Sequence, residues 1–95
     1  FENVFARQVE ALGNAGDVLL AISTSGKSVN VNLAIAEAKR HGMTVIGLLG
    51  KDGGSSKEIA DVSIVIPSND TQRIQEGHIT TAHIICGIIE NEMFS

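Results

Sequence analysis

Apolar residues recur along the chain with two different periods, and their alternation predicts the order of the elements. The first twelve residues carry apolar side chains at helical spacing, and Gly13 can end that helix. Three short, continuous apolar runs are typical of strands buried on both faces, at 18–22, 44–49 and 62–66. Helices are expected between and after them, from about Ser28 to Gly42, from about Ser56, and from about Asp70 to Phe94. The pattern therefore predicts strands that alternate with helices.

Polar residues at the expected helix starts and one glycine suggest where the helices begin and end. Gly42 is expected to cap the second helix. Ser55 with Glu58, and Asn69 with Gln72, have the spacing of capping boxes before the two later helices.

This order predicts a three-layer α/β fold of the flavodoxin or Rossmann type, with a parallel sheet and helices on both faces. Three strands make a thin sheet, and the first and last helices are largely apolar. We therefore expect half of a larger domain, or a subunit that buries its remaining surface against partners. The chain starts at Phe1 rather than Met. We accordingly expect residues 1–95 to be a partial domain whose N-terminal part is not represented.

Length, charge and cysteine usage exclude several classes of protein. The 95 residues suffice for at most one small domain. Seven basic residues scattered among eleven acidic ones, with a net charge of −4, argue against a nucleic-acid partner. No apolar stretch of about 18 residues is present, so we expect no membrane partner. The single cysteine, Cys86, is expected to be buried and suits a reducing cytosol.

The loop after the first predicted strand is rich in hydroxyl groups. In open parallel sheets, ligands bind beyond the carboxyl ends of the strands, and a helix N-terminus favours an anion. Ser23, Thr24, Ser25 and Ser28 would add hydroxyl donors there, and Gly26 would let the backbone approach a ligand closely. The loop therefore predicts a phosphate site. The alternative is an ordinary turn in which Ser28 only caps the helix.

The "GKS" within this loop does not make an ATP site. A P-loop requires a glycine five residues before Gly26, and Ala21 occupies that position, still within the strand. The second strand also lacks an acidic end residue that could hold magnesium.

The last helix separates its polar groups when its residues are placed about 100° apart. His78 lies within the apolar stripe, whereas His83 lies on the less apolar side and Gln75 at the border. The stripe consists of Ile74, Ala82, Ile85, Ile89 and Met93. His78 is therefore expected to be a hydrogen-bonded core or interface residue, and His83 is the better candidate for chemistry. Gln75 and His83 lie about 12 Å apart along the axis, so they could contact one ligand only by leaning toward each other.

Three motifs in order, "VLLAISTSGKSVNV", "GMTVIGLLGKDGG" and "RIQEGHITTAHIICGIIE", resemble the C-terminal half of the phosphoheptose isomerases, a family of sugar isomerase (SIS) domain proteins. The resemblance covers nearly the whole chain. It implies an aldose–ketose isomerase that converts sedoheptulose 7-phosphate to D-glycero-D-manno-heptose 7-phosphate through an enediol, toward the heptoses of bacterial lipopolysaccharide. It also implies a cytoplasmic, zinc-dependent homotetramer.

The same resemblance implies roles for individual residues. Ser23, Thr24, Ser25 and Ser28 match the family's phosphate-binding loop. Gln75 matches a residue that contacts both substrate and metal, and His83 matches a zinc ligand that also serves as catalytic acid or base. The family's partner carboxylate, its second zinc histidine and its Asn-Gly-Gly-Ser loop lie upstream of this sequence. We therefore expect the chain to be inactive by itself.

Two other functions stay open at this stage. A non-catalytic adaptor of the same superfamily, which binds a replication initiator as a tetramer, would share the Ser-rich loop, although His83 favours the enzyme. A sugar-phosphate sensor from a regulator would need a DNA-binding module that this chain does not show. Gln72 stands where some isomerases carry an acidic residue, which leaves the substrate contacts, the sugar stereochemistry and the pathway open.

Overall fold

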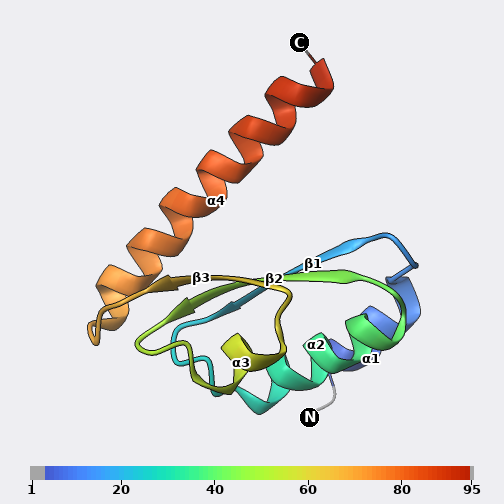
Figure 1. The fold of residues 1–95 in the computed structure, drawn as a ribbon, viewed down its shortest axis with the longest axis horizontal. Helices are drawn as coiled ribbons and strands as arrows, with labels where there is room; N and C mark the ends of the chain where they lie inside the picture. Colours follow the sequence, from blue (N-terminus) through green and yellow to red (C-terminus); the bar gives the residue numbers. More distant parts are fainter. Residues whose placement is uncertain (1–3, 95) are drawn as a thin grey trace.

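In the computed structural model, which describes residues 4–94, three strands form one parallel sheet in the order β1-β2-β3 (Figure 1). The strands are β1 (Val18–Ser23), β2 (Thr44–Gly50) and β3 (Val62–Ile66). The helices are α1 (Val4–Leu12), α2 (Val29–Arg40), α3 (Gly54–Ile59) and α4 (Thr71–Phe94). The predicted order of elements and the α/β fold class are thereby confirmed.

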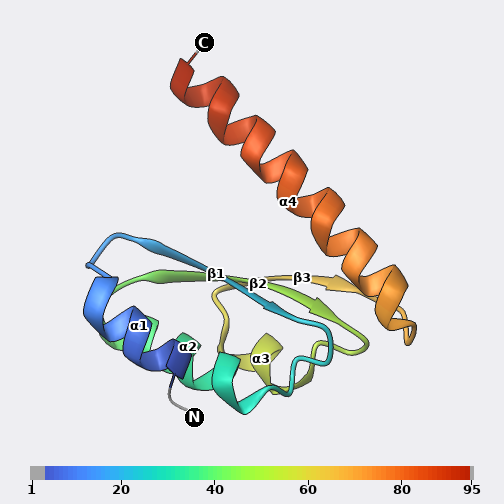
Figure 2. The same cartoon turned by 180° about the vertical axis from the view of Figure 1, so that it is seen from behind.

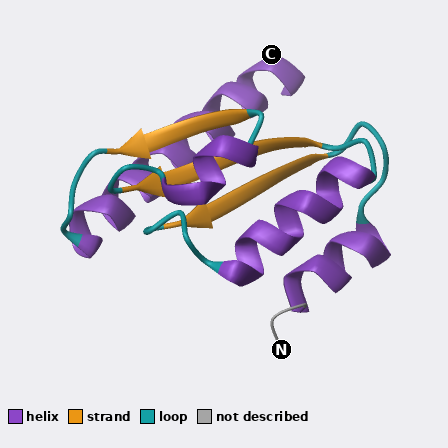
Figure 3. Ribbon diagram, turned by 60° about the horizontal axis from the view of Figure 1, so that its bottom comes forward, coloured by secondary structure: helices purple, strands orange, loops and turns teal. Residues whose placement is uncertain are grey.

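The helices lie on both faces of the sheet, but unevenly. α1, α2 and α3 cover one face, whereas α4 starts against the other face and then runs away from it (Figures 1 and 2). All three strands point the same way, so their carboxyl ends meet at one edge (Figure 3). The register pairs Leu20 with Ile46, and Ile46 with Val62, across the sheet.

The main core lies between the sheet and α2. It is built from buried Ala21, Ile35, Ala38 and Val45, with partly buried side chains from α1 and α3 around it. The spacing of Ile35 and Ala38 on α2 follows the helical period, which is why the sequence could identify this face. A smaller apolar contact on the opposite face buries Ile74 of α4 completely.

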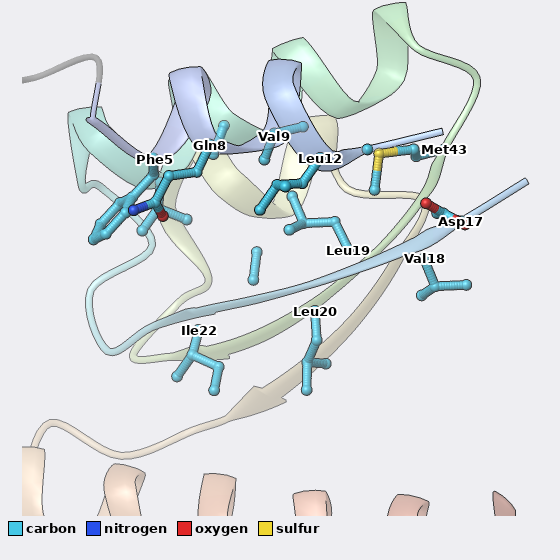
Figure 4. Close-up of a pocket in the computed structure, with 14 residues that line it drawn as sticks. Phe5, Gln8, Val9, Leu12, Asp17, Val18, Leu19, Leu20, Ile22 and Met43 are labelled. Atoms are coloured by element: carbon cyan, nitrogen blue, oxygen red, sulfur yellow. The ribbon is translucent and has the colours of Figure 1, made fainter. Parts of the chain in front are cut away.

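The edge strand β1 remains open on the α4 side of the sheet. Val18, Leu20 and Ile22 are 58%, 39% and 52% exposed, because α4 contacts β2 and β3 instead. Figure 4 shows these three side chains pointing away from α1, and an apolar groove of about 640 Å³, lined by residues of α1 and β1, runs along this open edge. This part of the sheet therefore has apolar surface that residues 4–94 do not cover.

The helix ends confirm one predicted cap and correct two. Gly42 has a positive φ of 75° just after α2, and the amide of Met43 bonds to the carbonyl of Ala38 in the way typical of glycine-ended helices. α3 starts at Gly54 rather than near Ser56, and Gly53 precedes it without a side-chain cap, so the Ser55 capping box is wrong.

The cap of α4 also differs from the prediction. The Asp70 carboxylate accepts the Gln72 N–H at 3.0 Å, and the Asp70 carbonyl accepts the first helical bond, from Ile74. Asp70, and not Asn69, therefore caps α4.

Two further expectations concern exposure and membranes. Cys86 is exposed, not buried as predicted, because α4 has left the sheet before this position. Among the described helices, none is long and apolar enough to cross a membrane.

Candidate functional site

The Ser-rich loop, residues 24–28, leaves the carboxyl end of β1 and leads directly into α2. The side chain of Ser28 caps α2 by accepting the Val31 N–H at 3.4 Å. The N–H groups of Val29 and Asn30 in the first turn have no acceptor within the helix. Two backbone donors and the positive end of the helix dipole therefore remain for an anion at this loop.

The loop hydroxyls also organise the loop itself. Ser23 is buried, and its oxygen accepts the Gly26 N–H at 3.0 Å. The oxygen of Ser25 accepts the Lys27 N–H at 3.1 Å. Because each of these hydroxyl groups acts as the acceptor, its own proton stays available for donation to a phosphate oxygen. Capping by Ser28 and anion binding are thus compatible rather than alternative roles.

Gly26 serves the contact with a neighbouring loop, which the sequence reading did not anticipate. Its φ is +68°, and a Cβ there would lie only 1.9 Å from the carbonyl oxygen of Gly53. The same contact requires Gly54 to lack a side chain, since its Cβ would lie 2.6 Å from the Gly26 carbonyl oxygen. The open side of Gly26 is therefore filled by the β2–α3 loop, and the close approach of a ligand to its backbone stays a prediction.

Three polar side chains hold the two loops together through hydrogen bonds. Ser56 is fully buried, and both its N–H and its hydroxyl lie 2.9 Å from the carbonyl oxygen of Gly26. Ser55 approaches the same oxygen at 3.3 Å and accepts the amide N–H of Asn32 at 2.8 Å. The Asn32 side-chain oxygen in turn lies within bonding distance of the Ser56 hydroxyl.

Gly50 joins the loop to α4. A Cβ at Gly50 would lie 2.4 Å from the Thr24 carbonyl oxygen and 2.6 Å from the side chain of Ile74. The Ser-rich loop, the end of β2 and the first turn of α4 therefore meet at one point of the sheet edge. Gln75, exposed and next to Ile74, starts from the same corner as Thr24.

Charged side chains border a neighbouring cavity of about 380 Å³. Lys27, Lys51, Asp52 and residues 67–69 line it, at the carboxyl ends of all three strands. The N–H of Gly54 bonds to the Asp52 carboxylate at 2.9 Å and lowers its pKa below the ordinary value, with desolvation opposing this shift and the charge of Lys27 adding to it. The edge therefore carries ionised groups of both signs.

The two histidines of α4 have the environments that the helical wheel predicts. His78 is 3% exposed and its Nε2 lies 2.7 Å from the carbonyl oxygen of Leu49, so this nitrogen is the donor. Its Nδ1 is buried without a partner in the described part of the chain. His83 is exposed and lies more than one helical turn after His78 along α4, which runs away from the sheet (Figure 1).

The described residues do not by themselves make up a metal site. Within residues 4–94, no group of three or more His, Cys, Asp or Glu side chains is placed to hold a metal ion. Gln75 and His83 offer an amide oxygen and an imidazole nitrogen from one exposed side of α4, whereas catalytic zinc takes three protein ligands. A complete zinc site would therefore need ligands from outside this chain.

Asn32, Gly53, Ser55 and Ser56 are the structural residues that the sequence reading missed. The "DGGSS" segment resembles the Ser-rich loop in being small and hydroxyl-rich directly after a parallel strand. That similarity could have indicated that the two loops contact each other, because adjacent parallel strands bring the loops that follow them to the same edge of the sheet.

Comparisons with known proteins show the family to which the chain belongs. The SIS domain family matches residues 1–50. Over 94 residues the chain is 57% identical to the phosphoheptose isomerase of Citrifermentans bemidjiense and 54% identical to that of Clostridium acetobutylicum, covering 99% of this chain in both cases. It covers only 49% and 48% of those proteins, so the chain spans about half the length of the curated relatives it matches.

Solved structures give the same result for the fold. The chain superposes on the phosphoheptose isomerase of Neisseria gonorrhoeae with a TM-score of 0.93 and 47% identity, covering 96% of this chain and 51% of that one. For the Francisella tularensis phosphoheptose isomerase the TM-score is 0.92 at 41% identity, covering 96% and 49%. The three-stranded sheet with its long last helix is therefore an arrangement found in these enzymes.

Proposed function

This chain belongs to the SIS domain family, and from that premise we propose that it forms part of an enzyme that isomerises sedoheptulose 7-phosphate to D-glycero-D-manno-heptose 7-phosphate. The observation that carries the proposal is the identity of 57% with a phosphoheptose isomerase along 94 residues. Both the Ser-rich loop and α4 lie within the matched part. We assign the reaction to the full-length protein, because the chain spans about half of such enzymes.

In this proposal the Ser-rich loop binds the phosphate of the sugar. The free amides of Val29 and Asn30 and the hydroxyl protons of Ser23, Thr24, Ser25 and Ser28 would donate to its oxygens. Such donors are already oriented by the turn that precedes α2, so little ordering is needed when the anion binds.

His83 would act as the acid or base that moves a proton between adjacent carbons or their oxygens through the enediol. Its imidazole is exposed within the described residues, so a ligand can reach it. Gln75, next to the Thr24 corner, would contact the sugar.

We also propose that zinc binds the full-length protein, with Gln75 and His83 as the ligands that this chain contributes. When bound, zinc would polarise the sugar carbonyl. The apolar surface on α4 and along β1 supports a homotetramer, and the single exposed Cys86 is compatible with a cytoplasmic location.

The test uses the purified full-length protein. We expect it to convert sedoheptulose 7-phosphate to the aldoheptose phosphate, and His83→Ala to lower kcat by about 100-fold or more, the usual range for a lost acid–base group. His41→Ala is the matched control, because His41 ends α2 at the opposite edge of the sheet and contacts Glu37 instead. Zinc content measured by mass spectrometry should fall in the His83 variant only.

A protein that folds and assembles, holds no zinc and leaves sedoheptulose 7-phosphate unchanged would contradict the proposal. That result would favour the non-catalytic adaptor, in which the same loop serves a tetrameric binding protein.

A further inference from the structure

Three hydrogen-bond donors converge on one carbonyl group of the Ser-rich loop. The Gly26 oxygen accepts the Ser56 N–H at 2.9 Å, and the hydroxyls of Ser56 and Ser55 lie 2.9 and 3.3 Å from it. A carbonyl oxygen has two lone pairs, so this one is fully saturated from the α3 side.

The donors belong to Ser55 and Ser56 in the first turn of α3, and they bond to the Ser-rich loop rather than cap α3. Gly53 precedes α3 and offers no side-chain cap, while Ser56 turns its N–H and hydroxyl toward Gly26, thirty positions earlier. Asn32 on the second turn of α2 holds both serines, donating to Ser55 and accepting from Ser56. The single hydroxyl proton of Ser56 is thus shared between the Gly26 carbonyl and the Asn32 amide oxygen.

The orientation of one peptide group links this cluster to the anion site. In a trans peptide the carbonyl and the following N–H point in opposite directions. Because the Gly26 carbonyl points to α3, the N–H of Lys27 points away from α3, where it bonds to the Ser25 oxygen at 3.1 Å. That bond makes Ser25 an acceptor within the loop and leaves its hydroxyl proton free for a ligand.

From these contacts we propose that Ser56, supported by Asn32, is a positioning residue for phosphate binding by the Ser-rich loop. It turns the negative end of the Gly26 peptide away from the anion and presents the hydroxyl of Ser25 to it. Ser56 itself is fully buried and touches no ligand. The inference rests on the proposed function only in taking the ligand to be a phosphate.

The test measures the affinity of the full-length protein for inorganic phosphate by titration calorimetry, together with KM and kcat for sedoheptulose 7-phosphate. We expect Ser56→Ala to weaken phosphate binding and to raise KM about fivefold, the effect of one hydrogen bond of ordinary strength. The value of kcat should change by less than twofold, because the loop does not touch the reacting carbons. Ser56→Cys nearly keeps the side-chain volume and has a weak donor, so its phosphate affinity and KM should lie between those of the wild type and Ser56→Ala.

Ser63→Ala is the matched control, because the Ser63 hydroxyl is also buried but has no hydrogen-bond partner in the described part of the chain. It should leave phosphate affinity unchanged. If Ser56→Ala fails to fold, phosphate affinity and KM are compared with the wild type for Ser56→Cys and Asn32→Ala instead.

An unchanged phosphate affinity in a folded Ser56 variant whose Tm has fallen would overturn the proposal, since Ser56 would then be merely structural. Phosphate binding that depends on Ser56 in a protein without isomerase activity would support this inference and contradict the proposed function. A wild-type protein that does not bind phosphate would contradict both.

Discussion

Single side chains in this molecule often form hydrogen bonds with the backbone of another element. Asp61, between α3 and β3, shows this clearly. Its carboxylate accepts the N–H of Val45, in the central strand, at 2.7 Å and lies 3.4 Å from the Lys39 ammonium group. The Val45 hydrogen bond, more than the charge of Lys39, holds the pKa of Asp61 below its usual value, although desolvation acts in the opposite direction.

This lowered pKa predicts a loss of stability in acid. A carboxyl group whose pKa is lower in the folded than in the unfolded protein stabilises the fold above the unfolded value of about 3.9, and the contribution disappears as pH falls through the folded value. We therefore expect Asp61→Asn to lower Tm at pH 7 and the gap to the wild type to narrow below pH 4. Thermal unfolding of the full-length protein between pH 3 and 7 measures this. A gap that stays constant over that range would show that ionisation of Asp61 contributes nothing.

At the scale of elements, the fully buried contacts of α4 with the sheet lie in its first two turns, within residues 4–94. Ile74 is completely buried against Gly50, and one turn later His78 donates to the Leu49 carbonyl. Beyond these turns Ile79, Ile84 and Ile88 are each 58% exposed. Because Ile74 also touches the corner where Thr24 meets β2, this contact sets the position of the helix that carries Gln75 and His83.

Ile74 should therefore tolerate only small changes. We expect Ile74→Ala to lower the free energy of unfolding by about 2–5 kcal/mol, since it leaves a cavity under α4, and Ile74→Val by about 0.5–1.5 kcal/mol. Urea unfolding of the full-length protein at one fixed concentration gives both values. Equal stability of the alanine variant and the wild type would mean that α4 is held elsewhere.

At the scale of the whole molecule, much apolar surface is exposed. The α4 side of β1 and most of α4 expose large aliphatic side chains that residues 4–94 do not cover. Exposed apolar surface of this extent indicates burial against other protein. The proposed homotetramer is one way to bury the surface of α4.

That assembly predicts a specific sensitivity on α4. Ile88→Glu should lower the molar mass of the full-length protein measured by light scattering from tetramer to dimer or monomer, because a buried charge is costly at an apolar interface. Glu90→Gln also changes the charge by one unit, but it lies about 200° around the helix and should leave the mass unchanged. An unaltered mass for Ile88→Glu would show that this face of α4 is not an interface.

Local patterns predicted the elements well and the contacts between elements poorly. The apolar runs of β1, β2 and β3 and the helical spacing of Ile35 and Ala38 are properties of neighbouring positions, so they could be identified directly. The cap of α4 was missed by one residue because Asn69 and Asp70 are both good caps. The prediction that Cys86 is buried was wrong, because its exposure depends on where α4 leaves the sheet.

For the candidate site, the Ser-rich loop, the buried His78 and the exposed His83 follow from position in the fold and from the helical wheel. The roles of Ser23, Thr24, Ser25, Ser28, Gln75 and His83 toward substrate and zinc stay predictions. The partners of Gly26 could not be predicted, because Gly53 and Ser56 reach it only through the register of β1 with β2.

The sequence by itself determined the alternation of strands and helices, the parallel sheet and the place of the hydroxyl-rich loop, because hydrophobic period and turn residues act over a few positions. Only the tertiary structure decided which glycines touch, which carbonyl the serines of α3 saturate, and how much of α4 stays uncovered. Those features depend on distances between residues such as Asn32 and Ser55, 23 positions apart, or Gly26 and Ser56, 30 positions apart. Such distances arise when the strands align and the helices dock on the sheet.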